Sequence, residues 1–186
     1  ILSVLFYTIS AWLPTMLTNL GLISSTASRM LSVVNFAAIP CALIVSLLVT
    51  RTRTQIWATT AGSGLLLIGL LGIFISPTHL TLLWVIIFGL GHGTSTGVAY
   101  SLPLLRSRNA RTTAELGGMS QTAGYLLAAV GPVGAGYIHD VTKGWEAPIL
   151  ILVILVITQL LCGLLAGRDL YVSDMTQYTS KILRSS

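Results

Sequence analysis

The chain has 186 residues, of which 54% are hydrophobic and only 8% are charged, and its formal net charge is +5. Ordinary soluble domains contain about 25% charged residues, so this chain has too few polar side chains to cover a water-soluble globule. Its mean hydropathy of +0.87 agrees with that conclusion. The composition excludes a soluble globular domain and predicts a membrane protein.

Six apolar segments of about 18 to 26 residues follow one another along the chain, close to the roughly 20 residues that cross a bilayer core. They lie at about 1–21, 27–50, 55–75, 80–105, 113–138 and 147–167. The links between them are short and contain the Ser, Thr, Gly and Pro residues that end helices. The sequence therefore predicts an all-α, polytopic membrane protein, with a six-helix transmembrane bundle over 1–167 and a cytoplasmic tail over 168–186.

The first segment begins at Ile1 rather than Met, and it lacks the basic start and the small-residue cleavage site of a signal peptide. We therefore expect the chain to begin inside a helix of a longer protein. This segment carries Tyr7 and Trp12 at depth, and the second carries Asn35. Arg29, about one turn inside the second segment, either extends its guanidinium to the membrane interface or attracts an anionic solute.

The third and sixth segments are the most aliphatic, which is typical of helices with a wide lipid-facing surface. The fourth contains GLGHGTSTG, in which Gly89, Gly93 and Gly97 recur every four residues. That spacing predicts close contact with a neighbouring helix. His92, inside the same stretch, is the only histidine at depth, and it either bonds to a neighbouring helix, contacts a ligand or handles a proton.

The fifth segment reads GMSQTAGYLLAAVGP, and its glycines and proline would weaken a helix in water. In a bilayer such residues are tolerated, because packed neighbouring helices restore the lost backbone contacts. Gln121 and Tyr125 are four residues apart and therefore share one face of the helix. We expect Gly131 and Pro132 to bend the helix near its outer end.

A rise of about 1.5 Å per residue places Trp12, Asn35, His92 and Gln121 about 12 to 18 Å from the nearer ends of their segments. Each of them alone is explained by a bond between helices or by packing. Together they predict a cavity at mid-membrane, since polar groups at that depth require one another, water or a ligand. The candidate substrate-binding residues are Tyr7, Trp12, Arg29, Asn35, His92, Gln121 and Tyr125.

The basic residues indicate the orientation. With six crossings, eight of the ten Lys and Arg fall on one side, and the positive-inside rule makes that side cytoplasmic. The net charge is therefore a topology signal, and we expect no nucleic-acid partner. The sequence contains no phosphate loop, no HExxH and no metal-ligand cluster, so it predicts no catalytic residue, cofactor or metal, and an intramembrane enzyme is disfavoured.

Several of these stretches resemble the C-terminal half, helices seven to twelve, of a major facilitator superfamily transporter. The block GLGHGTSTGVAYSLPLLRSRNARTTAELGGMSQTAGYLLAAVGP looks like the cyanate and 2-nitroimidazole porter branch, as do AWLP and NFAAIP. The resemblance covers about residues 7–145. The link RTRTQ lacks the Gly and Asp of the superfamily's loop signature, and an arginine at position 29 is not general in the branch.

The resemblance implies half of a fold built as a 3+3 inverted repeat, whose first and fourth helices line a central cavity. It also implies a missing N-terminal six-helix half and a bacterial inner-membrane location. The expected function is secondary transport, by alternating access, of a small anionic or polar organic solute such as cyanate or a nitroimidazole-like compound. The alternative is a membrane-embedded receptor that binds a small ligand without moving it. The expected partners are the solute, membrane lipid and the missing half.

Overall fold

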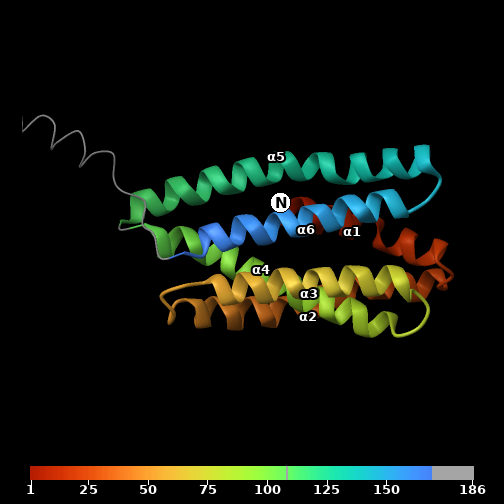
Figure 1. Cartoon of the computed structure of the whole chain (residues 1–186), viewed down its shortest axis with the longest axis horizontal. Coiled ribbons are helices and arrows are strands. Elements are labelled where there is room, and N and C mark those ends of the chain that lie inside the picture. The colour runs from red at the N-terminus through yellow and green to blue at the C-terminus, as the bar shows by residue number, and fades with distance from the viewer. Residues whose placement is uncertain (108, 169–186) are drawn as a thin grey trace, which may run out of the picture.

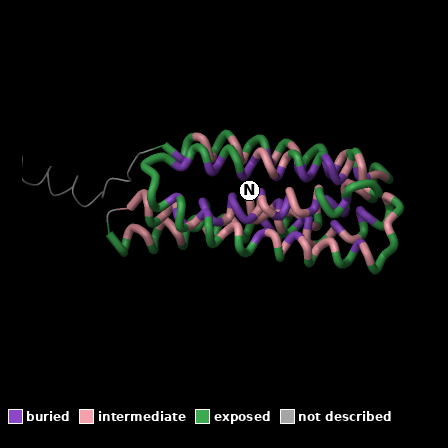
Figure 2. Tube along the Cα trace, turned by 90° about the horizontal axis from the view of Figure 1, so that it is seen from below, coloured by how far each residue is buried: buried purple, intermediate pink, exposed green. Residues whose placement is uncertain are grey.

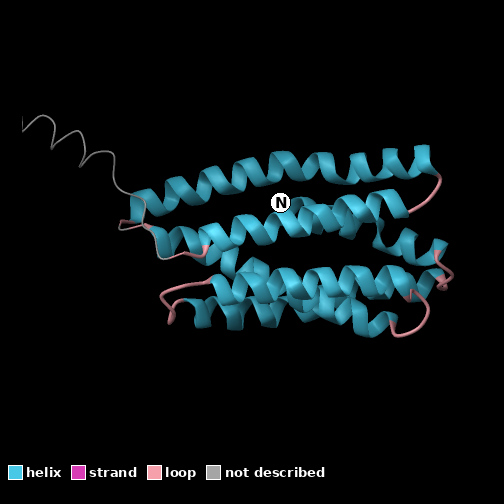
Figure 3. Cartoon of the chain, in the orientation of Figure 1, coloured by secondary structure: helices cyan, strands magenta, loops and turns pink. Residues whose placement is uncertain are grey.

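The structure, a computed structural model, describes residues 1–107 and 109–168 and contains six helices (Figure 1). No strand occurs in these two ranges (Figure 3). The helices are α1 (Leu2–Asn19), α2 (Ser24–Val49), α3 (Ile56–Ile75), α4 (Thr81–Arg106), α5 (Ala110–Thr142) and α6 (Glu146–Ala166). Each predicted segment corresponds to one helix, so the predicted all-helical fold is confirmed. The tail predicted over 168–186 lies outside the described residues beyond Arg168.

The helices run roughly along one axis, and consecutive helices are joined at alternate ends (Figure 1). The links 50–55 and 107–109 lie at one end, which we call the arginine-rich end because Arg51, Arg53 and Arg106 gather there. The links 20–23, 76–80 and 143–145 lie at the opposite end. This alternation is the arrangement expected of helices that cross a membrane repeatedly.

Four helices are long and apolar enough to span a membrane by length and composition, namely α2, α3, α4 and α6. The helices α1 and α5 are not in this set. Both carry polar side chains near their middle, such as Tyr7 and Thr8 in α1 and Ser120 and Gln121 in α5. A helical membrane bundle is therefore supported, while the crossings by α1 and α5 remain predictions.

Tight packing centres on α4, which lies against both α2 and α3. The predicted contact of its glycines is confirmed. A Cβ on Gly89 would lie 2.6 Å from Val34 O, one on Gly97 would lie 2.6 Å from Ala42 O, and one on Gly93 would collide with Ala38 O. The residues that they meet on α2 are also four apart, so the two backbones touch along a shared stripe.

The outer surface of the bundle is apolar, and its buried residues face inward (Figure 2). Long aliphatic side chains on α2, α5 and α6 are exposed, among them Leu43, Leu126 and Ile154. Only three residues of α5 are buried, Ala128, Ala135 and Gly136, although the helix has 33 residues. These faces are suited to contact with acyl chains or with further transmembrane helices.

Gln55 fixes the arginine-rich end. Its side chain is 1% exposed, and its Nε2 donates to Thr52 O at 2.8 Å and to Val49 O at 3.3 Å. Its Oε1 accepts a hydrogen bond from Arg106 Nη2, and its backbone N–H donates to Gly167 O at 3.0 Å. Through its side-chain amide and its backbone N–H, Gln55 thus joins the α2–α3 link to the C-terminal ends of α4 and α6.

We expect Gln55→Leu to lower the free energy of unfolding by about 2–3 kcal/mol, because similar volume is kept while buried polar partners lose their bonds. Thermal unfolding of the purified full-length protein in detergent measures the change. Thr158→Val is the control, since that exposed hydroxyl bonds to Ile154 O within its own helix, α6. An unchanged midpoint for Gln55→Leu would show that Gln55 does not hold this end together.

Candidate functional site

A cavity of about 340 Å³ lies between α1, α4 and α5. Four of the seven predicted site residues line it, namely Tyr7, His92, Gln121 and Tyr125. The remaining lining residues are Ile1, Leu2, Ser3, Phe6, Thr96, Ala99, Tyr100, Ser120 and Gly124. We call this space the polar cavity, because hydroxyl, amide and imidazole groups make up much of its wall.

Aromatic rings from three helices form one side of the polar cavity. The imidazole of His92 stacks on Phe6, with ring centroids 4.6 Å apart and planes 9° apart. Tyr7 meets Phe6 edge to face at 5.5 Å and Tyr125 edge to face at 6.2 Å. Rings in these orientations offer both faces and edges, so the wall is suited to contact with a flat solute.

Two polar atoms beside the cavity have no protein partner in the described part of the chain. They are His92 Nδ1 and Thr96 Oγ1, and both are buried. A buried polar group without a hydrogen bond destabilises the site by about 1–3 kcal/mol, so each is a natural contact for a bound molecule. Among the described residues, no Lys, Arg, Asp or Glu lines the cavity. Its wall therefore offers a solute hydrogen-bonding groups and aromatic rings rather than formal charges.

The cavity is open on one side. Tyr7, Tyr100 and Tyr125 are 44%, 59% and 48% exposed, so the phenol groups border an opening rather than a sealed interior. Thr96 and Tyr100, which we did not predict, follow His92 at intervals of four residues on α4. That spacing puts all three on one face of the helix, and it was the sequence signal available for finding them.

Trp12 lies outside the polar cavity, toward the end of the bundle that is opposite the arginine-rich end. Its Nε1 donates to Pro132 O at 2.8 Å, and its ring centroid is 5.6 Å from that of Trp145. The ring also covers Gly136, where a Cβ would be 2.6 Å from the indole. Trp12 therefore connects α1 to α5 and does not line the polar cavity.

Asn35 and Arg29 also lie away from the polar cavity. Asn35 Nδ2 donates to Leu31 O, one turn back in its own helix, at 3.0 Å. Arg29 is exposed on α2. The structure thus brings together Tyr7, His92, Gln121 and Tyr125, and it does not bring Trp12 of α1 or the two predicted residues of α2 to the same wall.

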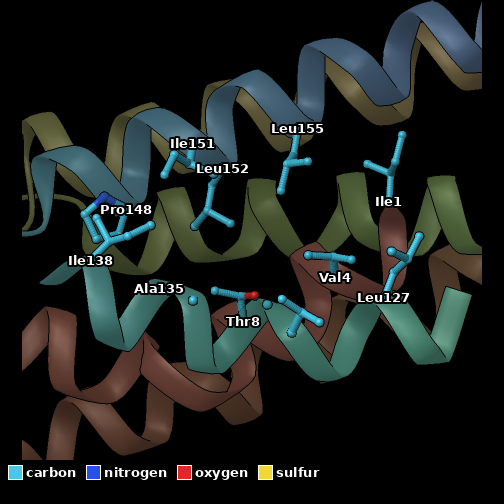
Figure 4. A pocket seen from close by; sticks show the side chains of 13 residues that line it. Ile1, Val4, Thr8, Leu127, Ala135, Ile138, Pro148, Ile151, Leu152 and Leu155 are labelled. Atoms are coloured by element: carbon cyan, nitrogen blue, oxygen red, sulfur yellow. The ribbon is translucent and has the colours of Figure 1, made fainter.

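A second cavity, of about 350 Å³, lies between α1, α5 and α6 (Figure 4). The side chains that surround it are aliphatic apart from Thr8, whose buried Oγ1 has no hydrogen-bond partner among the described residues. Val4, Leu152 and Leu155 are among the side chains drawn around it in Figure 4. One hydroxyl cannot orient a polar molecule, so the polar cavity is the better candidate for solute binding.

Among residues 1–107 and 109–168, no three His, Cys, Asp or Glu side chains are grouped so that they could hold a metal ion.

Comparison with known proteins gives three relatives. The chain is 42% identical over 171 residues to an uncharacterized transporter, YycB, of Bacillus subtilis strain 168, covering 91% of this chain and 42% of that protein. It is 31% identical over 167 residues to the 2-nitroimidazole transporter of Escherichia coli K12, covering 90% of this chain and 42% of that protein. It is 38% identical over 116 residues to a putative anionic 4-hydroxy-benzoate permease of Thauera aromatica, covering 62% of this chain and 70% of that protein.

The chain thus spans about two fifths of the length of the first two relatives. No family profile matches the chain, and no solved structure matches it. The three relatives agree in being transporters or permeases, and the third is covered over more than two thirds of its length at 38% identity. The chain belongs to this family of membrane transporters.

Proposed function

We propose that the protein is a secondary transporter that moves a small polar organic solute across the membrane by alternating access. The polar cavity carries this proposal, because it brings stacked rings and unpaired polar atoms together inside a helical bundle of a transporter family. Its volume of about 340 Å³ suits a small molecule. Cyanate-like and nitroimidazole-like compounds and other small anionic or polar solutes are the candidate substrates.

In this proposal Tyr7, His92, Gln121 and Tyr125 contact the solute directly. His92 and Gln121 supply hydrogen bonds from α4 and α5, and the two tyrosines supply ring contacts and hydroxyls. Trp12 joins α1 to α5 outside the cavity through its bond to Pro132 O. Arg29 and Asn35 do not line the polar cavity, so this proposal gives them no contact with the solute there.

We further propose that the bundle is one half of a major facilitator fold, with the other half supplied by an N-terminal six-helix unit. If α1–α3 and α4–α6 are repeats, the contact between α2 and α4 is equivalent to the contact between α5 and α1. Both pairs pack against each other in the structure. The exposed apolar faces of α2 and α5, and the open side of the polar cavity, are where the second half would pack.

The orientation follows from the arginines. Arg51, Arg53, Arg106 and Arg111 lie at or beside the arginine-rich end, whereas Arg29 and Lys143 lie toward the other end. By the positive-inside rule we propose that the arginine-rich end, where α6 also ends, faces the cytoplasm of a bacterial cell.

Reconstitution of the full-length protein in liposomes tests the function. We expect saturable uptake of at least one of 2-nitroimidazole, 4-hydroxybenzoate and cyanate, and exchange of labelled for unlabelled solute across the membrane. Liposomes without protein give the background. Saturable binding without any exchange would instead favour a receptor, and the absence of both binding and flux for all three compounds would contradict the proposed solute class.

A further inference from the structure

The cavity between α1, α5 and α6 has no role in the proposed transport site. Its volume is about 350 Å³, and we call it the aliphatic cavity (Figure 4). Among the described residues that line it, Thr8 is the only one with a polar side chain. Apolar cavities of about 150 Å³ stay free of water and accept a molecule of the size of benzene. The aliphatic cavity therefore has room for a ring with a short alkyl chain.

The hydroxyl group of Thr8 differs from other hydroxyl groups in these helices. In α4, Thr94 and Ser101 each donate at 2.8 Å to the carbonyl oxygen four residues earlier. Thr8 is 2% exposed, yet its Oγ1 has no hydrogen-bond partner among the described residues. This oxygen lies so close to Gly131, which also lines the cavity, that a Cβ there would collide with it. The unpaired oxygen is therefore directed toward the α5 side of the cavity.

The cavity uses a face of α5 that differs from the face available to a second half. Leu126 and Val133 are 70% and 73% exposed and are seven residues, or about two turns, apart, so they mark the outward face. Leu127 and Gly134 line the cavity, and each follows one of these residues directly, about 100° further around the helix. The site therefore leaves α2 and the outward face of α5 free for the second half.

The opening of the cavity lies between α5 and α6. Leu127 and Ile151 line the cavity from these two helices and are 58% and 40% exposed. The helix α6 is long and apolar enough to span a membrane. An opening with aliphatic borders beside such a helix is suited to molecules that are dissolved among acyl chains.

Gly134 keeps the space beside α5 open. A Cβ on Gly134 would have no atom within 4 Å, so the cavity extends to the backbone of the helix. A larger side chain at this position would fill the cavity without displacing a neighbouring backbone. Gly134 is therefore the position at which the cavity can be closed by substitution.

We propose that the aliphatic cavity binds a small apolar molecule with a single hydroxyl group, such as an alkylphenol, that enters from the bilayer. Its hydrocarbon part packs against aliphatic side chains such as Ile138 and Leu152. Its hydroxyl group forms a hydrogen bond with Thr8 Oγ1, which can donate or accept. This inference goes beyond the proposed transport function, because such binding requires neither transport nor the polar cavity.

Equilibrium binding of 4-propylphenol and propylbenzene to the full-length protein in lipid nanodiscs tests the site. The two probes share a ring and a propyl chain and differ only in the hydroxyl group. Empty nanodiscs of the same lipid measure the partitioning of each probe into the bilayer, and no transported solute is added. We expect saturable binding of 4-propylphenol that is about twofold to tenfold tighter than that of propylbenzene, as one additional hydrogen bond provides.

Three variants locate the binding. Thr8→Val keeps the shape of the side chain but removes the hydroxyl group, so we expect the two probes to bind to it equally. Gly134→Leu fills the cavity, and we expect it to lose saturable binding of both probes. Gly64→Leu is the matched control, because a Cβ at Gly64 also has no atom within 4 Å and Gly64 does not line the cavity. We expect Gly64→Leu to bind both probes as the unmodified protein does.

Three results would overturn the proposal. Equal affinity of the unmodified protein for the two probes would show that Thr8 does not recognise the hydroxyl group and that the cavity accepts any hydrocarbon, acyl chains included. Unchanged binding of 4-propylphenol to Gly134→Leu would place the bound molecule elsewhere. Absence of saturable binding of both probes would remove the site but would leave the transport function untouched, because exchange in liposomes tests that function separately.

Discussion

Gly93→Ala is expected to lower the free energy of unfolding by about 1–3 kcal/mol or more, although alanine favours helix over glycine. The added methyl group would collide with the backbone oxygen and carbons of Ala38 on α2, which cannot rotate away as a side chain could. Relief requires α2 and α4 to separate along the whole stripe of Gly89, Gly93 and Gly97. Thermal or detergent unfolding of the purified full-length protein measures the effect.

Gly64→Ala is the matched control for that experiment. It makes the same change within α3, where a Cβ would have no atom within 4 Å. We expect Gly64→Ala to be neutral or slightly stabilising, because only the helix preference of alanine remains. If the two variants unfolded at the same midpoint, the close approach of α2 and α4 would be wrong.

His92→Ala is expected to reduce transport by about fivefold to 150-fold without unfolding the protein. The imidazole stacks on Phe6 and places an unpaired Nδ1 beside the polar cavity. Loss of one hydrogen bond to the solute weakens its binding by about 1–3 kcal/mol, which corresponds to that range. Initial rates of solute exchange in liposomes, normalised to the amount of inserted protein, provide the measurement.

One further variant separates ring stacking by His92 from hydrogen bonding by its nitrogen atoms, and a second variant is the control. His92→Phe keeps a flat ring against Phe6 but removes the nitrogen atoms, so we expect it to be as defective as His92→Ala if the hydrogen bond carries the effect. Tyr137→Phe changes a residue of α5 that is 71% exposed and does not line the polar cavity, and we expect normal transport. Normal exchange by His92→Ala would remove His92 from the solute site.

Most of the fold could be predicted from the sequence, because bilayer thickness and link residues determine where apolar helices begin and end. The largest difference is in α5, which was predicted over 113–138 and extends over Ala110–Thr142. At its start, Asn109 accepts a hydrogen bond from Thr112 N at 2.7 Å, so the helix begins earlier than the apolar residues do. It ends where Lys143 adopts a φ of 57°. These are local backbone contacts, which the apolar pattern does not register.

The candidate site could be predicted only in part. Counting residues gives the level of a side chain along its helix, and it predicted similar depths for His92 and Gln121, which line one cavity. It does not give the direction around the helix axis, which depends on packing. Asn35 follows Val34, whose backbone is in contact with α4, and the side chain of Asn35 bonds to Leu31 O of its own helix. Trp12 likewise points away from the polar cavity, because its Nε1 donates a hydrogen bond to Pro132 O.

The uneven burial of the helices has a mechanical consequence. The helix α4 is wedged between α2 and α3, whereas α5 buries three of its 33 residues and borders both cavities. The polar cavity therefore lies between a closely packed helix, which carries His92, and a sparsely packed one, which carries Gln121. A molecule that bridges these two side chains would link α5 to the tightly packed group of α2, α3 and α4.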